Sequence, residues 1–289
     1  MTNRERTVGT HDGSFHADEV TACALLLLFG CVDRDKIIRT RDLAKLATCE
    51  YVCDVGGIYD PAQKRFDHHQ VDYQGSFSSA GMVLSYLHDQ QVLTVAAYDF
   101  FNQTLILGVD AHDNGHDLQI KGVTTYSMII ANFTPLFQDA SAEEQNHAFE
   151  EALNFANSHL NRLWDRYQYT FSCREIVKEA MAQESSCLMF DKAIPWMDSF
   201  FELGGLAHPA HYMIMPSGTH WKLRGIPPSL DDRMRVRSPL PEKWAGLMGD
   251  DLKKATGISG AIFCHKGRFI SVWETREDAL KAWELATHE

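Results

Sequence analysis

Five side chains that can bind a metal or move a proton stand within nine residues near the start of the sequence. They are His11, Asp12, His16, Asp18 and Glu19. The segment follows the short apolar run Thr7–Thr10 and precedes a stretch with helical apolar spacing. In a parallel α/β sheet, the turn between a strand and the next helix lies at the C-terminal edge, where ligands bind. We therefore expect this segment to line a ligand site.

Three further groups of the same residue types follow short apolar runs. Asp54 ends one run and precedes Gly56-Gly57, which permit a tight turn. Asp67-His68-His69 forms the next group. Asp110 follows the run Leu105–Val109, and its near neighbours are His112, Asp113 and His116. We expect each group to lie where a strand ends, so that all of them meet at one edge of a sheet.

Carboxylates mixed with imidazoles suit Mn²⁺ or a related divalent ion. Taken singly, His11, His16 and Asp110 are more often turn or cap residues, and Asp54 is as often one as not. The adjacent pair His68-His69 is harder to explain in this way, and the combination favours a metal site. Several carboxylates on different strand ends repel one another unless cations lie among them. Two ions about 3.5–4 Å apart can activate a bridging water and neutralise phosphoryl oxygens. This predicts phosphodiester hydrolysis by in-line attack of a metal-bridging hydroxide, with two Mn²⁺, or with Mg²⁺, Co²⁺ or Zn²⁺ as alternatives.

Strands separated by helices are predicted for residues 1 to about 135, which favours a parallel α/β sheet. The expected elements are a helix over Ala17–Phe29, strands over Lys36–Thr40 and Tyr51–Val55, and a helix over Ser79–Leu87. From Ser141 to about Ser185 the chain lacks glycine and has a helical apolar stripe. Ser141 with Glu144 is typical of a capping box that starts a helix.

Short strands dominate the remainder of the chain. They are expected over Cys187–Phe190, His211–Met215, Trp221–Ile226, Ala261–His265 and Phe269–Trp273. Lys266-Gly267-Arg268 would join the last two as a hairpin, and Thr275 would cap a final helix. We therefore predict an α/β protein with an N-terminal parallel-sheet catalytic domain (1–140), a helical connector (141–185) and a smaller C-terminal α+β domain (186–289).

Composition excludes several classes of protein. The chain has 289 residues, of which 45% are hydrophobic and 23% charged, so disorder, collagen and coiled coil are unfavourable. A net charge of −12 argues against a general nucleic-acid coat protein, although it leaves room for a nucleic-acid enzyme. No apolar run is long enough to cross a membrane. The seven cysteines lack zinc-finger spacing, which predicts free thiols in a reducing cytoplasm.

A basic segment between Trp221 and Trp244 is the candidate substrate-binding region. Its positive residues are Lys222, Arg224, Arg233, Arg235, Arg237 and Lys243. Arginines beside tryptophans could track phosphates and stack bases. An ordinary solvated loop is an equal alternative on the residues alone. His265 and Arg268, at the expected hairpin, are a second candidate phosphate contact.

The four groups resemble the motifs of the DHH phosphoesterase superfamily. The longer stretches around them, from His11 to Glu19 and from Arg65 to Gln70, are more similar to the melanocyte proliferating gene family. Two C-terminal stretches, Leu240 to Leu247 and Gly257 to His265, resemble that family as well. The resemblance covers nearly the whole chain. It implies a DHH-like fold for the N-terminal domain and a metal-dependent hydrolase, since a eukaryotic member acts as a 3′–5′ RNA exonuclease.

The resemblance also implies residue roles. One ion would be held by His11, His16 and Asp54. The other would be held by Asp18, Asp54, His68 and Asp110, with Asp54 bridging. Asp67 would orient a neighbouring imidazole, and His69 would face the substrate phosphate as a donor or proton carrier. The catalytic set is then Asp54, Asp67 and His69.

The predicted function is a 3′–5′ exonuclease acting on RNA or a short oligonucleotide. One alternative is a phosphatase or phosphodiesterase for small nucleotides, such as short oligonucleotides or cyclic dinucleotides. Another is a metal-binding or nucleic-acid-binding regulator without turnover. The sequence leaves the oligomeric state open, with a homodimer as one option.

Overall fold

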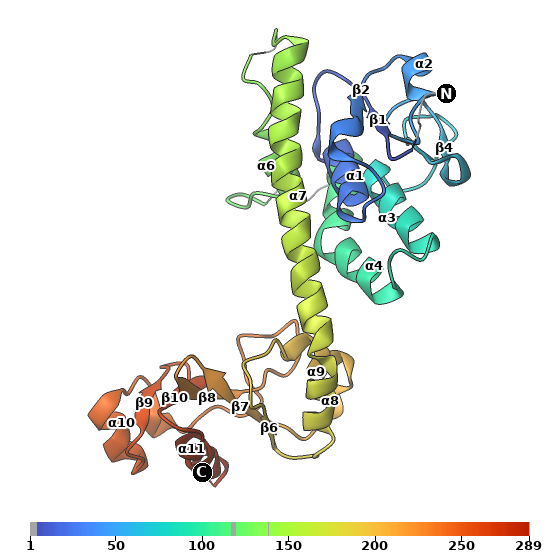
Figure 1. Ribbon diagram of the computed structural model, residues 1–289. Coiled ribbons are helices and arrows are strands. Elements are labelled where there is room, and N and C mark those ends of the chain that lie inside the picture. Colours follow the sequence, from blue (N-terminus) through green and yellow to red (C-terminus); the bar gives the residue numbers. More distant parts are fainter. Residues whose placement is uncertain (1–4, 117–119, 138, 289) are drawn as a thin grey trace. The chain divides into compact units, whose positions relative to one another are not determined.

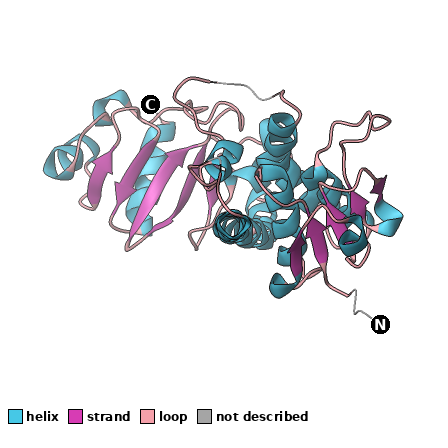
Figure 2. Ribbon diagram, turned by 90° about the horizontal axis from the view of Figure 1, so that it is seen from above, coloured by secondary structure: helices cyan, strands magenta, loops and turns pink. Residues whose placement is uncertain are grey.

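The protein is described by a computed structural model that covers residues 5–116, 120–137 and 139–288. The chain forms two compact units, Met1–Tyr167 and Gln168–Glu289. Each unit contains a five-stranded sheet with helices packed on it (Figures 1 and 2). This confirms the predicted α/β class. The division falls inside the predicted connector.

The sheet of the first unit carries the ligand-rich turns. Its strands are β1 (Val8–Thr10), β2 (Ile37–Arg39), β3 (Tyr51–Cys53), β4 (Tyr59–Asp60) and β5 (Arg65–Phe66), in the order β2-β1-β3-β5-β4. The first four strands in that order run parallel, and β4 pairs antiparallel with β5. Because β1, β3 and β5 are neighbours, His11, Asp54 and Asp67 leave the sheet at one edge. The predicted parallel sheet and this shared edge are both present.

Helices that pack beside this sheet complete the first unit. They are α1 (Ala17–Leu28), α2 (Leu43–Leu46), α3 (Ser79–Asp89), α4 (Val95–Phe101), α5 (Leu107–Asp113) and α6 (Tyr126–Ala131). Apolar residues of α1, such as Val20 and Leu25, are fully buried with Met82 and Leu84 of α3. This apolar contact fixes α1 and α3 next to each other, so both helix starts lie near the strand ends.

A 31-residue helix, α7 (Ala142–Ser172), begins at the predicted capping box (Figure 1). The amide of Glu144 donates to Ser141 Oγ (3.2 Å), and the amide of Ser141 donates to the Glu144 carboxylate (2.7 Å). Its buried residues Phe149 and Leu153 belong to the core of the first unit. A second helix, α8 (Arg174–Met181), follows it.

The second unit contains a mixed sheet in the order β6-β7-β8-β10-β9. The strands are β6 (Cys187–Met189), β7 (Tyr212–Ser217), β8 (His220–Gly225), β9 (Ala261–Cys264) and β10 (Ile270–Trp273). Only the β6–β7 pair is parallel among the described pairings of this sheet. The helices are α8, α9 (Met197–Glu202), α10 (Gly249–Thr256) and α11 (Arg276–Thr287). The predicted hairpin β9–β10 and the Thr275 cap of α11 are confirmed.

One predicted element is wrong. Leu105–Val109 is not a strand, because it spans the end of a π-helical turn and the start of α5. Leu107 in the middle of the run is 53% exposed, whereas a strand with both faces buried would cover it. Asp110 therefore lies on a helix rather than after a strand. Among the described residues, no helix combines the length and apolar character needed to cross a bilayer.

Candidate metal centre

Asp54 occupies the middle of the candidate site. It follows β3 directly and has a left-handed backbone (φ 57°), and Gly56 and Gly57 continue the turn with φ of 101° and 69°. Aspartate tolerates this region better than most residues, and glycine adopts it freely. The turn places the Asp54 side chain in the interior, where it is 1% exposed. Both of its oxygens are buried without a hydrogen-bond partner among the described residues.

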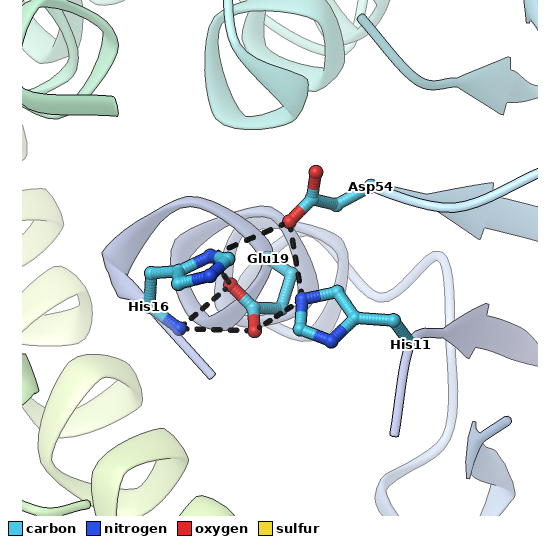
Figure 3. Close-up of side chains that lie close together, drawn as sticks. All are labelled: His11, His16, Glu19 and Asp54. Carbon is cyan, nitrogen blue, oxygen red and sulfur yellow. Dashed lines mark hydrogen bonds and ion pairs between the residues drawn. The ribbon is translucent and has the colours of Figure 1, made fainter. Parts of the chain in front are cut away.

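Two imidazoles and a second carboxylate surround Asp54 on one side (Figure 3). His11 Nε2 lies 3.3 Å from Asp54 Oδ2 and 2.9 Å from Glu19 Oε1. His16 Nδ1 lies 3.7 Å from Asp54 Oδ2 and 3.3 Å from Glu19 Oε2. Glu19 stands in the first turn of α1 and also accepts hydrogen bonds from the His16 amide. The four side chains therefore point at a common centre from β1, β3 and α1.

The nitrogen and oxygen atoms that could bind a metal lie close together but form no hydrogen bonds with one another. Although His11 Nε2 is close to two carboxylates, it has no hydrogen-bond partner among the described residues, and neither has His68 Nε2. Only ion-pair contacts with neighbouring charges, at 2.9 Å for His11 and 3.0 Å for His68, offset the cost of burying these atoms. Nitrogen and oxygen lone pairs that converge in this way fit a divalent cation. The residues present therefore suit the metal that the motifs imply.

His68 belongs to a second group of ligand atoms on the other side of Asp54. Its Nε2 lies 3.0 Å from Asp113 Oδ2, 3.6 Å from Asp54 Oδ1 and 3.9 Å from Asp18 Oδ2. The side chains of Asp18 and His68 are buried, and that of Asp113 is mostly so. Asp54 has one oxygen toward each group of ligands, which fits a carboxylate shared by two ions.

Asp67 holds His69 in place beside Asp54. Asp67 Oδ1 lies 2.7 Å from His69 Nδ1 and accepts the His69 amide, while Oδ2 accepts the Gly57 amide at 2.5 Å. His69 Nδ1 also lies 3.4 Å from Asp54 Oδ1. The His69 side chain is 61% exposed, so its other ring nitrogen is available to solvent or to a substrate. The roles expected for these two residues stay predictions.

The start of α3 ties Asp18 and Asp110 to the site. Asp18 accepts from Ser78 Oγ (2.6 Å), Ser79 N (2.9 Å) and Ala80 N (2.6 Å). Asp110 Oδ1 accepts from Ser78 N (3.0 Å), Ser78 Oγ (2.7 Å) and Gly81 N (3.2 Å). A side chain on Gly81 would collide with Asp110, because a Cβ there would stand 2.4 Å from Oδ2. Ser78 thus links the two carboxylates.

Mutual charge shifts the pKa of several site residues. Burial lowers the pKa of His11, but the carboxylates of Asp54 and Glu19 outweigh it and raise the pKa to about 10. The carboxylate of Asp113, followed by that of Asp54, raises the pKa of His68 to about 10. Burial raises the pKa of Asp18 well above its usual range, aided by the charges of Asp54 and Asp113. Without a cation, the imidazoles therefore hold protons that a metal would displace.

Most of the metal-ligand and catalytic residues named from the sequence meet in the structure. Those brought together are His11, His16, Asp18, Asp54, Asp67, His68 and His69. Asp110 lies outside the three groups of converging ligand atoms found among the described residues, although it stays a predicted ligand. Glu19 and Asp113 belong to those groups and were not among the predicted ligands. Asp113 stands three residues after Asp110, on the same face of α5.

The candidate phosphate contacts of the second unit differ in their partners. Arg233 pairs with Asp198 (3.1 Å), and Arg235 pairs with Asp232 (3.2 Å). Arg237 donates to the carbonyls of Gly205, His208 and Ala210, which makes it structural. Arg224 on β8 is half-buried, and its Nε has no partner among the described residues.

Trp244 and His265 both pack against aromatic rings of the second unit. The expectation that Trp244 stacks on bases is wrong, because this side chain is 0% exposed and packs edge-on against Trp273 (5.8 Å). His265 accepts the Gly267 amide (2.9 Å) and lies against the Phe269 ring. Arg268 sits in the hairpin with φ 55° and lines a cavity of about 750 Å³ together with His211.

Comparison with known families decides the membership of the chain. The model of the MYG1 exonuclease family, described as "Uncharacterised protein family (UPF0160)", matches residues 7–287. The chain belongs to this family. The match confirms the resemblance to the melanocyte proliferating gene family that the motifs indicated.

Relatives in bacteria and animals share nearly the full length of this MYG1 family member. A "MYG1 protein" of Chlamydia muridarum is 56% identical over 280 residues, which cover 97% of this chain and 96% of that protein. The "MYG1 exonuclease" of Homo sapiens is 32% identical over 317 residues, which cover 94% and 83% respectively. Among solved structures, RecJ of Thermus thermophilus in complex with Mn²⁺ matches all of this chain and 53% of its own, with 11% identity and a TM-score of 0.27. A similarity this low supports no conclusion.

Proposed function

We propose that the first unit binds two divalent cations and hydrolyses phosphodiester bonds at the end of a nucleic acid. The observation that carries this proposal is Asp54, whose buried oxygens have no hydrogen-bond partner among the described residues and lie within 3.3–3.7 Å of four imidazoles. Membership of a family whose animal relatives are named exonucleases supports a hydrolase.

Each side chain has a defined task in this proposal. One cation would be held by His11, His16, Glu19 and Asp54. The other would be held by Asp18, Asp54, His68 and Asp113, with Asp110 as the alternative to Asp113. Bound divalent cations lower the pKa of water and neutralise developing charge on phosphoryl oxygens. Asp54 keeps the two groups of ligands together because it reaches both.

His69 carries the proton-transfer task. The Asp67 carboxylate fixes Nδ1 of a side chain that is 61% exposed, so that Nε2 would be the atom that contacts a substrate. From there it can hydrogen-bond a phosphoryl oxygen or protonate the departing oxygen. Asp67 therefore acts on the reaction through His69.

The finer features are proposals as well. We favour RNA as substrate, 3′–5′ direction, Mn²⁺ as the cation and the cytoplasm as the compartment. None of the seven cysteines, all of which the structure describes, forms a disulfide, which supports a reducing environment. In the second unit, Arg224, whose half-buried guanidinium has an unpartnered Nε in the described part of the chain, is the best candidate for a phosphate contact, ahead of Arg233, Arg235, His265 and Arg268.

The test measures hydrolysis of short RNA labelled at its 3′ end, in the presence of Mn²⁺. Asp54→Ala and His68→Ala should each abolish hydrolysis, as should removal of metal by a chelator. Asp35→Ala and His147→Ala, at exposed positions, are the matched controls and should leave it unchanged. Full activity of both site variants would refute the site.

The same reaction separates the proposed substrate from its alternatives. An RNA series from two to twenty nucleotides, a DNA series and 5′-labelled RNA would report substrate and direction. Cleavage restricted to di- and trinucleotides would favour a small-nucleotide phosphodiesterase. Metal binding without turnover on any of these substrates would favour a regulator.

A further inference from the structure

A cavity of about 390 Å³ lies in the first unit beside the candidate metal centre. Its lining residues are Gly57, Ile58, Tyr59, Gln70, Asp72 and Tyr73. None of them belongs to the groups of converging ligand atoms. The volume is within the ~300–1,000 Å³ typical of small-molecule sites. We call this cavity the tyrosine pocket.

The walls of the tyrosine pocket continue from the residues of the metal centre. One wall begins three residues after Asp54, and the other begins at Gln70, one residue after His69. Asp67 is bonded to both walls: the Gly57 amide donates to its Oδ2 (2.5 Å), its amide donates to the Ile58 carbonyl (3.1 Å), and Gln70 Nε2 donates to its carbonyl (2.9 Å). Consecutive Cα atoms are about 3.8 Å apart, so the pocket starts next to His69.

The chemistry of the lining favours a flat, uncharged ring over a phosphate. Tyr59 and Tyr73 lie edge to face, with ring centroids 5.5 Å apart at 74°. Tyr59 is 37% exposed, which is high for an aromatic ring that only packs loops together. The lining contains no lysine or arginine among the described residues, and Asp72 would repel an anion. Aromatic side chains beside a nucleic-acid site offer stacking surfaces to bases.

We propose that the tyrosine pocket is a nucleobase subsite. Tyr59 and Tyr73 would contact the base of a nucleotide whose phosphodiester lies at the metal centre. The inference rests on the proposed function and specifies how its substrate is held. It accounts for recognition of the base end of a nucleotide by this unit, whereas the metal centre engages the phosphate end.

The experiment compares two short RNAs that differ only in their bases. One is intact, and the other has abasic ribose at both nucleotides that flank the terminal phosphodiester. The wild-type protein with Mn²⁺ should cleave the intact RNA with a kcat/KM higher by roughly 5- to 100-fold, which is the size expected for base–aromatic stacking. Most of this difference should appear in KM.

Variants of the two tyrosines test whether the tyrosine pocket causes the preference for intact RNA over abasic RNA. Tyr59→Leu and Tyr73→Leu should each reduce the preference for intact RNA by at least about fivefold and leave cleavage of the abasic RNA unchanged. Tyr59→Phe and Tyr73→Phe keep the rings and should retain the preference. Tyr169→Leu, at a 53% exposed tyrosine of α7, is the control. If the leucine variants lower kcat/KM equally for the intact and the abasic RNA, or for neither, the nucleobase subsite is overturned.

A measurement on the wild-type protein does not depend on the folding of any variant. A nucleoside 5′-monophosphate should inhibit RNA cleavage roughly 5- to 100-fold more strongly than ribose 5-phosphate, because only the first has a base to place in the pocket. Equal inhibition would overturn the subsite while the proposed function stands. Absence of any cleavage by the wild-type protein would instead overturn the proposed function, and the subsite with it.

Discussion

The metal centre of the first unit and the basic segment of the second unit hold their charged side chains in opposite ways. In the metal centre, Asp54 and His11 are buried close to opposite charges. Yet both Asp54 oxygens and His11 Nε2 lack a hydrogen bond in the described part of the chain. In the basic segment, Arg233, Arg235 and Arg237 are satisfied by carboxylates or carbonyls of their own unit. Charge density alone therefore does not identify a site. Unsatisfied and converging atoms do.

The largest expected effect concerns pH. The pKa values of His11 and His68 stand at about 10 without metal, above the 6.5 of free histidine, so these imidazoles are protonated at neutral pH. Each must lose its proton to bind a cation, and every proton released changes the apparent affinity about tenfold per pH unit. Release of one proton at each cation predicts that binding of the two Mn²⁺ ions together weakens about 100-fold from pH 8 to pH 7, which is about tenfold per ion.

Calorimetry in buffers of different ionisation enthalpy measures the protons released by Mn²⁺. Release of fewer than one proton would contradict the account. Without metal, the same raised pKa values stabilise the folded chain most below about pH 6.5, and this contribution is lost as the pH rises through about 10.

The next largest effect separates Asp113 from Asp110. Asp113→Asn should weaken Mn²⁺ binding about 10- to 100-fold with little change in stability. Its carboxylate approaches His68 and, among the described residues, accepts no hydrogen bond from α3. Asp110→Asn should lower the free energy of unfolding by about 1–3 kcal/mol, because Oδ1 holds the start of α3. Titration of both variants with Mn²⁺ and urea checks this. The reverse pattern would make Asp110 the ligand, as the sequence motif implies.

A smaller effect tests the partners of the basic segment. Arg237→Ala should lower the free energy of unfolding by about 2–3 kcal/mol, since three carbonyls lose their donor. Arg224→Ala should leave stability nearly unchanged and raise the KM for RNA about 3- to 10-fold, as expected for the loss of one charged phosphate contact. Denaturation and steady-state kinetics provide both readings. An unchanged KM for Arg224→Ala would remove this arginine from the substrate path.

The smallest effect is expected at Arg235. Its side chain is 80% exposed and paired with Asp232 three residues earlier, and such surface pairs contribute only about 0–1 kcal/mol. Arg235→Ala should change the free energy of unfolding by less than about 1 kcal/mol and the KM for RNA by less than about twofold. A tenfold rise in KM would restore it as a substrate contact and weaken the contrast between the two regions.

The sequence predicted the sheet edge and most of the centre because short strands, glycines and ligand types coincide there. It failed at Leu105–Val109, where four apolar residues and a glycine fit a strand or a helix equally and only tertiary packing decides. Asp113 was not predicted as a ligand for the same reason. It lies on the same face as Asp110 only because the segment is a helix. Glu19 was hidden by its place in the first turn of α1, where an acid usually serves the helix itself.

The sequence also did not predict which aromatic side chains are buried. Trp244 stands among arginines in the sequence, which suggests a binding surface, but its ring fills the core of the second unit. Exposure of a tryptophan depends on the sheet and helices that close over it, and no local pattern encodes them.

Anomalous diffraction at the manganese edge, from crystals grown with Mn²⁺, tests the central claim most directly. The account predicts two peaks, one among His11, His16, Glu19 and Asp54 and the other among Asp18, Asp54 and His68. A map without a peak at Asp54, with these side chains paired to one another instead, would contradict it.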